Sequence, residues 1–250
     1  MRRKLFFILF SFGMFTYSIY GQESSVYISK LQTRALIGVS IPVTKPDATF
    51  DYHISDKRSI YIHTPFSISY FFHKHFGVEL NYQFETPIKD RTNTIITSVQ
   101  SDYGDNYDVR LEKNDDIGSE KYQLYLGLVY RLETNKFYTY PKIGIGITGC
   151  YTDFEKMYLK EKNSNNEYQI SYSGIPKFYF ILAPSVSFGY KISKRIYFNA
   201  DIMLSYYKPN IVYKKEFTNL YTKRSTVENI DYKKNIFTLS LGAGAIIVLR

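Results

Sequence analysis

The last stretch of the chain, residues 235–249, alternates strictly between large apolar side chains and very small ones. The apolar parity holds Phe237, Leu239, Leu241, Ala243, Ala245, Ile247 and Leu249, and the other holds Thr238, Ser240, Gly242 and Gly244. Successive residues of a β-strand point to opposite faces of a sheet, so a period of two predicts a strand. We therefore expect residues 235–249 to form a long strand with one apolar face and one face of small residues.

The same alternation recurs along the whole chain. Apolar parities run through residues 35–43, 60–72, 76–84, 122–132, 143–151, 178–190 and 196–206. Each segment is long enough to cross a bilayer at a tilt, which takes about 9 to 11 residues. We find no helical period of 3.6 residues beyond residue 33, so the sequence predicts an all-β protein of eight strands.

The connections between these strands alternate in length. Short turns lie at residues 73–75, 133–136 and 193–194, whereas the long connections span residues 45–59, 87–119, 156–175 and 208–234. All short turns and both chain ends therefore lie at one end of the sheet. An even number of antiparallel strands with short turns on one side and long loops on the other is typical of a transmembrane β-barrel.

The composition of the second parity indicates which medium surrounds the sheet. A soluble barrel would expose a polar face rich in Lys, Glu and Thr, but here this parity is small, as at Gly144, Gly146, Ser185 and Ser187. Small residues suit the crowded interior of a narrow barrel, so the large apolar side chains are predicted to face lipid. Closure would then pair every backbone N–H within the bilayer. The alternative interpretation is a soluble, secreted, lipocalin-like barrel that holds an apolar ligand inside.

Aromatic residues mark the two ends of the predicted strands. Tyr70, Phe72, Phe76, Tyr130, Phe137, Tyr190 and Phe198 lie by the short turns, and Phe84, Tyr122, Tyr151, Phe178, Tyr206 and Phe237 lie at the opposite ends. Trp and Tyr concentrate at membrane–water interfaces, and transmembrane barrels carry two such girdles. This placement supports the membrane interpretation.

The first 21 residues have the pattern of a secretory signal peptide. Arg2, Arg3 and Lys4 precede an apolar run from Leu5 to about Phe15, and small residues follow. We expect cleavage after residue 21 and a periplasmic lead at residues 22–33; an uncleaved anchor helix is the alternative. Loss of the three cations lowers the formal charge from +9 to +6. Export excludes a nucleic-acid partner, and the single cysteine excludes an internal disulfide.

The signal peptide, the eight strands and the asymmetry of their connections resemble the small outer-membrane β-barrel proteins of Gram-negative bacteria, of the porin-like or outer membrane protein A and X type. The likeness covers nearly all of the mature chain, with the barrel at residues 34–250. It implies a place in the cell outer membrane, contact with outer-membrane lipid and insertion by the barrel-assembly machinery. Members usually end on an aromatic residue, whereas this chain ends on Arg250.

Four charged residues point to the interior if parity is counted from the lipid face: Glu79, Arg131, Lys142 and Asp201. An isolated charge in a narrow lumen would cost several kcal/mol, so opposite charges should pair there. We expect a structural plug of salt bridges. The alternative is a gated solute path or a catalytic group, although an eight-stranded barrel has an interior just wide enough for side chains.

Prolines within three strands predict irregular pairing. Pro65, Pro141 and Pro184 each remove a backbone donor from the ladder. We therefore expect bulges or local irregularity at these positions.

Three motifs invite a ligand but lack its usual context. Residues 144–149, GIGITG, match a dinucleotide fingerprint, yet strand alternation runs through them and no helix follows. Two histidines, His73 and His75, cannot close a metal site alone, and Asp102, Asp105 and Asp108 miss the spacing of a calcium loop. We predict no cofactor and no metal site.

The pattern of a catalytic site is also missing from the sequence. His63 alone of the four histidines faces the interior, and no matching serine and acid are found at the rim of the loops. We therefore expect a non-enzymatic protein.

The long connections carry opposite net charges, −3 over residues 87–119 and +4 over residues 208–234. Candidate contacts in the basic connection are Lys214, Lys215, Tyr221, Lys223 and Arg224. They suit anionic lipopolysaccharide or a protein partner, although solvated loops are often charged without binding anything. The favoured function is a contribution to envelope structure or surface interaction through these loops. The alternative is an accessory of an outer-membrane transport or secretion apparatus.

Overall fold

The computed structural model describes residues 31–44, 60–88, 92–113, 121–150, 154–173 and 178–249. The predicted signal peptide, residues 22–30 of the predicted lead, the connection at 45–59, Tyr151 and Arg250 lie outside the described residues. Within the described segments, no helix is both long and apolar enough to span a bilayer.

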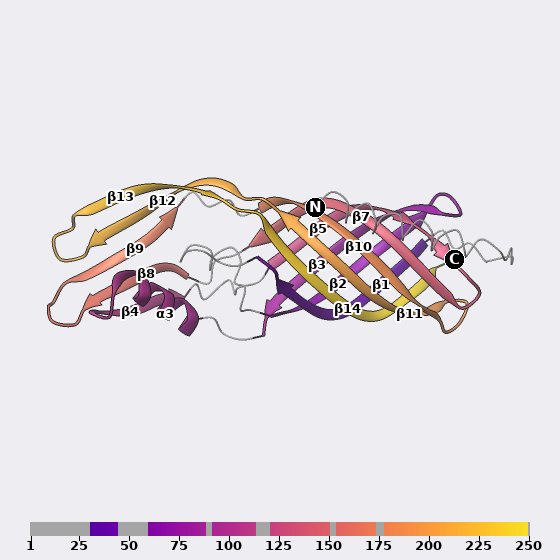
Figure 1. Ribbon diagram of the computed structural model, residues 1–250, viewed down its shortest axis with the longest axis horizontal. Coiled ribbons are helices and arrows are strands. Elements are labelled where there is room, and N and C mark those ends of the chain that lie inside the picture. Colours follow the sequence, from indigo (N-terminus) through magenta and orange to yellow (C-terminus); the bar gives the residue numbers. More distant parts are fainter. Residues whose placement is uncertain are drawn as a thin grey trace, which may run out of the picture.

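Eight antiparallel strands close into a barrel, as predicted (Figure 1). They are β1 (Leu31–Pro42), β2 (Tyr61–Phe71), β3 (Phe76–Pro87), β5 (Lys121–Tyr130), β7 (Phe137–Cys150), β10 (Phe178–Lys191), β11 (Ile196–Tyr207) and β14 (Ile236–Leu249). Each pairs with its neighbours in the chain, and β14 pairs with β1 from Leu31↔Leu249 to Pro42↔Thr238, which closes the barrel. A short strand, β6 (Leu132–Glu133), extends the ladder beside β7. Because β1 begins at Leu31, residues 31–33 of the predicted lead belong to the barrel.

The large apolar side chains lie on the outside of the barrel. Leu126 and Ile145 are 56% and 54% exposed, whereas Ser240 and Gly144 face inward and are buried. A carrier of apolar ligands would need the opposite arrangement. The lipocalin-like alternative is therefore wrong, and the outer surface suits hydrocarbon.

Exposed aromatic residues lie at both ends of the barrel. Phe72 and Phe137 are at the end with the short turns, and Phe178 and Phe180 are at the other. This is the arrangement of interfacial girdles on a membrane barrel.

The interior contains more than small side chains. Seven tyrosines are buried, and most of them come from strand ends: Tyr61, Tyr125, Tyr138, Tyr140, Tyr179, Tyr197 and Tyr207. The inward glycines make room for such rings, because a Cβ on Gly144 would lie 2.5 Å from the ring of Tyr125. Small residues on one strand thus make room for large residues on the next.

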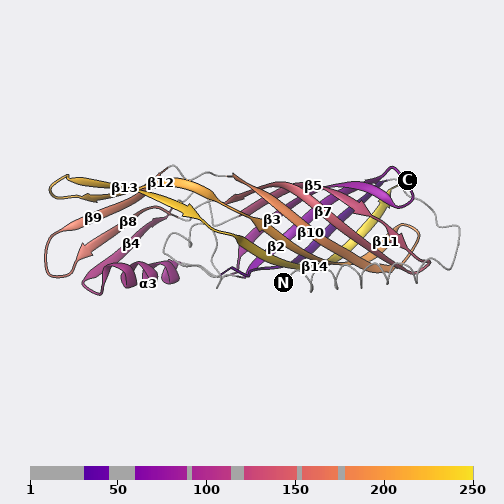
Figure 2. The same ribbon diagram turned by 45° about the horizontal axis from the view of Figure 1, so that its top comes forward.

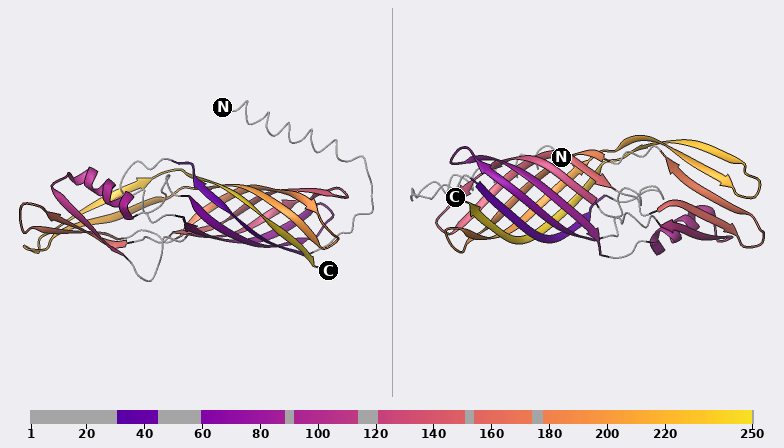
Figure 3. Two further views of the ribbon diagram at one scale, coloured as in Figure 1. Left: turned by 90° about the horizontal axis from the view of Figure 1, so that it is seen from below. Right: turned by 180° about the vertical axis from the view of Figure 1, so that it is seen from behind.

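The connections beyond the far end of the barrel fold into a second sheet. The sheet consists of strands β4 (Tyr107–Lys113), β8 (Phe154–Glu161), β9 (Glu167–Ser173), β12 (Asn210–Asn219) and β13 (Ser225–Lys233), and helix α3 (Thr92–Tyr103) packs against it. The strands are antiparallel in the order β13-β12-β9-β8-β4. We call α3 and these five strands the distal module. It continues the long axis of the barrel at the end opposite Leu249 (Figures 2 and 3).

The distal module has a hydrophobic core of its own. Val99 of α3 packs with Met157, Leu159 and Ile170 of the sheet, and all four are fully buried. Segments predicted as long loops therefore contain strands and a helix, and the expectation that no helix follows residue 33 is wrong for residues 92–103. The helical pattern of α3 is hard to recognise in the sequence, because its few apolar residues lie among Thr, Ser and Asn, which have weak helix propensity.

The prolines cause gaps in the ladders rather than bulges. Pairing between β1 and β2 is interrupted at Pro65 and resumes in the same register, and β10 and β11 behave alike at Pro184. The β5–β7 ladder ends at Lys142, next to Pro141. The described ladders shift register between Glu112 and Lys113, where β4 meets β8, and not at these prolines. Bulges at the prolines are thus not found, but local irregularity is.

The outward position of the apolar residues yields a test of the membrane-facing surface. We expect Ile145→Arg, in the middle region of β7, to lower the free energy of unfolding by about 2–4 kcal/mol, because the guanidinium would lie near the bilayer midplane. The matched change Phe72→Arg, beside a short turn, should cost only about 0–1 kcal/mol. Urea titration of the protein folded in phospholipid vesicles measures both. Equal costs at the two positions would contradict this placement of the bilayer.

Candidate functional site

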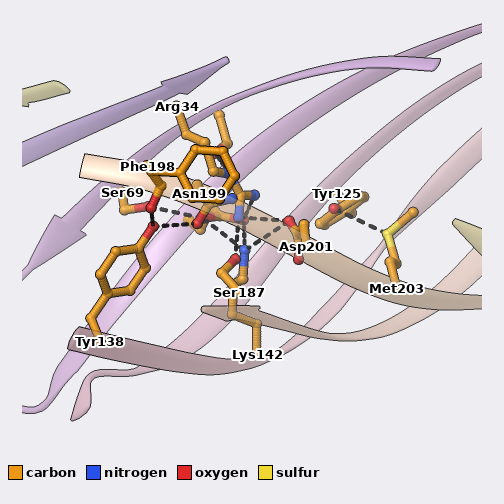
Figure 4. A network of polar contacts seen from close by, with 12 residues as sticks. Arg34, Ser69, Tyr125, Tyr138, Lys142, Ser187, Phe198, Asn199, Asp201 and Met203 are labelled. Atoms are coloured by element: carbon orange, nitrogen blue, oxygen red, sulfur yellow. Dashed lines mark hydrogen bonds and ion pairs between the residues drawn. The ribbon is translucent and has the colours of Figure 1, made fainter. Parts of the chain in front are cut away.

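Four charged side chains meet inside the barrel, each from a different strand. The Arg34 guanidinium lies 2.8 Å from a Glu79 carboxylate oxygen and 2.7 Å from Asp201 Oδ2. Lys142 Nζ lies 3.2 Å from Glu79 Oε1 and 3.5 Å from Asp201 Oδ2. Figure 4 shows Arg34, Lys142 and Asp201 converging on one point of the lumen. Two cations and two carboxylates form a cluster without net charge, which we call the central cluster.

Hydroxyl groups add hydrogen bonds to the central cluster, although the buried Asp201 Oδ1 has no hydrogen-bond partner among the described residues. Arg34 donates to Ser67 Oγ at 3.0 Å and also to Ser187 Oγ, and Ser69 Oγ donates to Glu79 Oε2 at 2.9 Å. Buried ion pairs are tolerated only when such extra hydrogen bonds satisfy their remaining polar atoms. The small polar residues of the inward parity therefore have a second use besides their size.

The structure brings three of the four predicted interior charges together and separates the fourth. Glu79, Lys142 and Asp201 belong to the central cluster. Its fourth member, Arg34, pairs with both carboxylates and was not among the predicted residues. The predicted first strand began at residue 35, so Arg34 fell one residue outside it. Extending the parity of Leu36 backwards by two residues would have placed Arg34 inside.

Arg131 belongs to a second cluster, near the short-turn end. Its Nε donates to Glu133 Oε1 at 2.6 Å, and Lys191 Nζ lies 2.7 Å from Glu133 Oε2. The Tyr140 hydroxyl also bonds Glu133, and the Arg131 guanidinium lies 4.8 Å from the ring centre of Phe71. A layer of buried aromatic and aliphatic residues surrounds this cluster: Phe71, Val129, Tyr138, Tyr140, Tyr197, Ile246 and Val248. The lumen is thus filled at this end too.

A serine–histidine pair lies between the central cluster and the distal module. Ser40 Oγ is 2.6 Å from His63 Nδ1 and 2.7 Å from Ser240 Oγ. Sequence reasoning missed this pair because Ser40 and His63 come from adjacent strands. Both are buried, and the adjoining cavity of about 10 Å³ has room for about one water molecule.

The remaining sequence motifs do not form a ligand site. His73 and His75 lie in the β2–β3 turn with ring centres 6.1 Å apart. Asp108 lies 3.8 Å from Lys162, and residues 144–149 lie within strand β7. In the described part of the chain, no three His, Cys, Asp or Glu side chains form a group that could hold a metal ion.

The five predicted loop contacts occupy different parts of the β12–β13 hairpin. Tyr221, Lys223 and Arg224 lie at its tip, where Tyr221 is 80% exposed. Lys214 and Lys215 are adjacent in β12 and therefore point to opposite faces of the sheet. Lys215 lies on the face covered by α3, with its ammonium 5.2 Å from the ring centre of Tyr103. The five residues form no single patch.

The face of the sheet away from α3 is internally paired near β4 and β8. The Tyr158 hydroxyl donates to Glu112 at 2.7 Å, and this hydrogen bond raises the pKa of Tyr158. Arg110 lies over the Tyr158 ring at 4.6 Å and 3.7 Å from Glu167. At the β8–β9 turn, hydrogen bonds from Ser164 and Asn166 lower the pKa of Glu161. These charged groups satisfy one another.

Comparison with known families agrees with this geometry. The family model described as "Outer membrane protein beta-barrel domain" matches residues 24–244. The chain belongs to this family. It is therefore a protein of the outer membrane. In bacterial transmembrane barrels the short turns commonly face the periplasm and the longer loops face the cell exterior.

Solved structures of outer-membrane barrels resemble the chain at low sequence identity. Neisserial surface protein A (NspA) is 10% identical, with a TM-score of 0.47, and the match covers 88% of this chain and 97% of that one. OprG from Pseudomonas aeruginosa is 15% identical, with a TM-score of 0.45 and the same two coverages. Ail, the attachment invasion locus protein of Yersinia pestis, is 13% identical, with a TM-score of 0.37, and the match covers 88% and 100%. No curated protein sequence matches the chain.

The central cluster yields a test of interior pairing. We expect Arg34→Ala to lower the free energy of unfolding by about 3–5 kcal/mol, because it leaves Glu79 and Asp201 with too little compensation. Adding Glu79→Ala should recover part of this loss in a double-mutant cycle. The exposed pair Lys233–Asp231, at 3.0 Å, is the control, and Lys233→Ala should cost about 0–1 kcal/mol. Strictly additive losses for Arg34 and Glu79 would contradict the pairing. Urea unfolding in vesicles measures the free energies of unfolding of Arg34→Ala, Glu79→Ala, the double variant and Lys233→Ala.

Proposed function

We propose that this outer-membrane protein is a closed, non-enzymatic barrel that anchors a folded contact module at the cell surface. The observation that carries the proposal is the contrast between its two halves. Among the described residues, the lumen holds two clusters of paired charges and several buried tyrosines, whereas the long connections form a sheet with its own core. We infer that such a barrel serves to support the distal module and does not conduct solutes.

The filled lumen argues against a solute path. The central cluster joins β1, β3, β7 and β11 across the interior, and an aromatic layer lies below it. The cavity beside His63 is about the size of one water molecule. Opening a path would require several buried ion pairs to separate at once, and each separated pair would leave an uncompensated charge.

The distal module argues for contact at a distance from the membrane. Strand β12 has ten residues, so at about 3.4 Å per residue the hairpin tip reaches roughly 30 Å beyond the start of the strand. Tyr221, Lys223 and Arg224 are at this tip, beyond the lipid headgroups. We infer that they contact an anionic partner at the surface, a protein or the outer saccharides of lipopolysaccharide. Lys214 and Lys215, lower on the hairpin, are the candidates for contact nearer the membrane.

The second candidate function is an accessory of a transport or secretion apparatus. The distal module could bind such an apparatus as readily as a foreign surface. The two functions differ in their phenotypes, because an accessory changes which proteins leave the cell. A surface protein changes only adhesion or envelope sensitivity.

A closed lumen predicts no steady ionic conductance. Purified protein inserted into planar bilayers should give no stable conductance steps above background, because the central cluster and the aromatic layer block the path. A porin in the same preparation controls for insertion. Reproducible steps from the wild-type chain, at a voltage that leaves the barrel folded, would contradict the closed anchor.

The role of the distal module can be tested with a shortened chain. Short turns would replace residues 89–119, 151–177 and 208–235, and heat-dependent gel migration would verify that the barrel still folds. In a strain that lacks the native protein, we expect the shortened chain to restore resistance to detergent but not adhesion or cell–cell aggregation. The full-length chain should restore both. Loss of proteins from the culture medium in the deletion strain would favour the secretion accessory instead.

A further inference from the structure

Strands β11 and β14 leave the barrel as a two-stranded ribbon and continue into the β12–β13 hairpin (Figure 2). The β11–β14 pairing ends at Tyr207↔Ile236, and the β12–β13 pairing begins at Asn210↔Lys233. A backbone hydrogen bond from the Lys234 amide to the Pro209 carbonyl keeps the same register between them. This register places Lys208 directly opposite Asn235, where the ribbon leaves the barrel.

An aromatic pair lies on the outer surface of the barrel just before this point. Tyr206 and Phe237 are cross-strand neighbours, and their ring centres are 4.9 Å apart. Aromatic side chains of transmembrane barrels lie at the boundary between hydrocarbon and headgroups. Lys208 and Asn235 are exposed, and each is two residues further from the barrel on the same outward face. They therefore lie about 7 Å further along the strands, at the level of the headgroups.

Three hydrogen bonds fix Asn235 in place. The Tyr206 hydroxyl donates to Asn235 Oδ1 at 3.0 Å, and Thr44 Oγ1 donates to the Asn235 carbonyl oxygen at 3.1 Å. The Phe237 amide donates to the same Thr44 Oγ1 at 2.8 Å. The side-chain contact uses Oδ1 and leaves the Asn235 amide nitrogen, a donor, without a partner among the described residues. The position of this donor is thus set before any ligand binds.

The charge of Lys208 is not compensated on this surface. It forms neither an ion pair nor a hydrogen bond with any described residue, and Asp231 on the same face is 3.0 Å from Lys233. The exposed side chains at this end of β1, β2, β3 and β10 are apolar: Val43, Ile60, Ile88 and Phe178. A cation and an amide donor therefore stand side by side above an apolar belt. This arrangement suits a ligand with an anion at its polar end and hydrocarbon below.

We propose that Lys208 and Asn235 bind a phosphate group of lipid A, the membrane anchor of lipopolysaccharide. The membrane itself covers this surface, because the chain is an outer-membrane barrel and its longer loops commonly face the exterior. The acyl chains lie on Tyr206, Phe237 and the apolar belt, and the phosphate accepts hydrogen bonds from the Lys208 ammonium and the Asn235 amide. Cross-strand neighbours have Cβ atoms about 4.5–5.5 Å apart, so both donors reach one phosphate.

A phosphate monoester suits two adjacent donors better than the diester of a phospholipid. It has one more terminal oxygen and carries a charge of about −1.5 to −2 at pH 7. The lipid site goes beyond the proposed function, because it concerns the base of the β12–β13 hairpin and not the partner at its tip. A lipid bound here ties the base of the distal module to the membrane surface.

The probe for this site is purified bisphosphorylated lipid A, titrated into the full-length protein in detergent micelles and followed by native mass spectrometry. We expect Lys208→Gln to weaken binding about fivefold, because the ammonium no longer meets the phosphate. Lys194→Gln makes the same charge change in the β10–β11 turn, at the opposite end of the barrel, and should leave the affinity nearly unchanged. Equal effects of the two variants would indicate diffuse attraction and overturn the site.

A neutral substitution tests the amide donor. Asn235→Ala should weaken lipid A binding about two- to fivefold, because one hydrogen bond to the phosphate is lost. Asn229→Ala, further out on the same face of the hairpin, is the matched control and should leave binding unchanged. Heat-dependent gel migration verifies that each variant is folded. Wild-type affinity of a folded Asn235→Ala variant would overturn the site.

Three further ligands test which chemistry is recognised. Lipid A without its phosphates should bind at least fivefold more weakly than the bisphosphorylated form, and equal binding would overturn phosphate recognition. Phosphatidylglycerol that binds as tightly as lipid A would overturn the choice of lipid. Displacement of lipid A by millimolar inorganic phosphate would overturn it in favour of a site for the free anion.

The lipid site and the proposed function can fail separately. Tyr221→Ala, at the hairpin tip, should leave lipid A binding unchanged. If Lys208→Gln and Asn235→Ala bind lipid A normally while adhesion requires the distal module, the lipid site falls and the surface function stands. If both variants lose affinity while the shortened chain still restores adhesion, the surface function falls and the lipid site stands.

Discussion

Backbone hydrogen bonding in hydrocarbon is the constraint on which the rest of this structure depends. An unpaired N–H or C=O group in the bilayer core costs several kcal/mol, and the lipid offers no water to bond it. A sheet therefore crosses the membrane only if it has no edge, and the pairing of β14 with β1 removes the edge here. Closure also fixes which residues face lipid and which face the lumen, because the side-chain period of a strand is two.

The filled lumen follows from closure of a barrel with so few strands. Eight strands leave an interior that side chains can occupy fully, so the inward parity must pack as a core does. Inward glycines make room for tyrosine rings, as Gly144 does for Tyr125, and the ion pairs of the central cluster balance to zero net charge. The same side chains that hold the strands together also block the path between them. In the proposed closed barrel, rigidity and a blocked path therefore have one cause.

The sequence predicts the barrel well because each barrel strand obeys one simple period. The interior site is predicted only in part, because parity finds Glu79, Lys142 and Asp201 but cannot say which charges meet. Arg34 was missed because the predicted strand starts at residue 35, whereas β1 starts at Leu31. The distal module was not predicted. Both faces of its strands carry polar residues, and its core brings together Val99, Ile170 and Phe217 from three separate connections. No local pattern records such a contact.

The need to satisfy backbone hydrogen bonds has different consequences for the two sheets, because one lies in lipid and the other in water. In lipid, an open edge is too costly, so every barrel strand has two partners. In water, the edge groups of β13 can bond solvent, and the strand can remain open without a large penalty. Water is also easily displaced by a second strand that offers the same donors and acceptors at the same spacing. An open edge is thus permitted only outside the membrane, and that is where a partner can reach it.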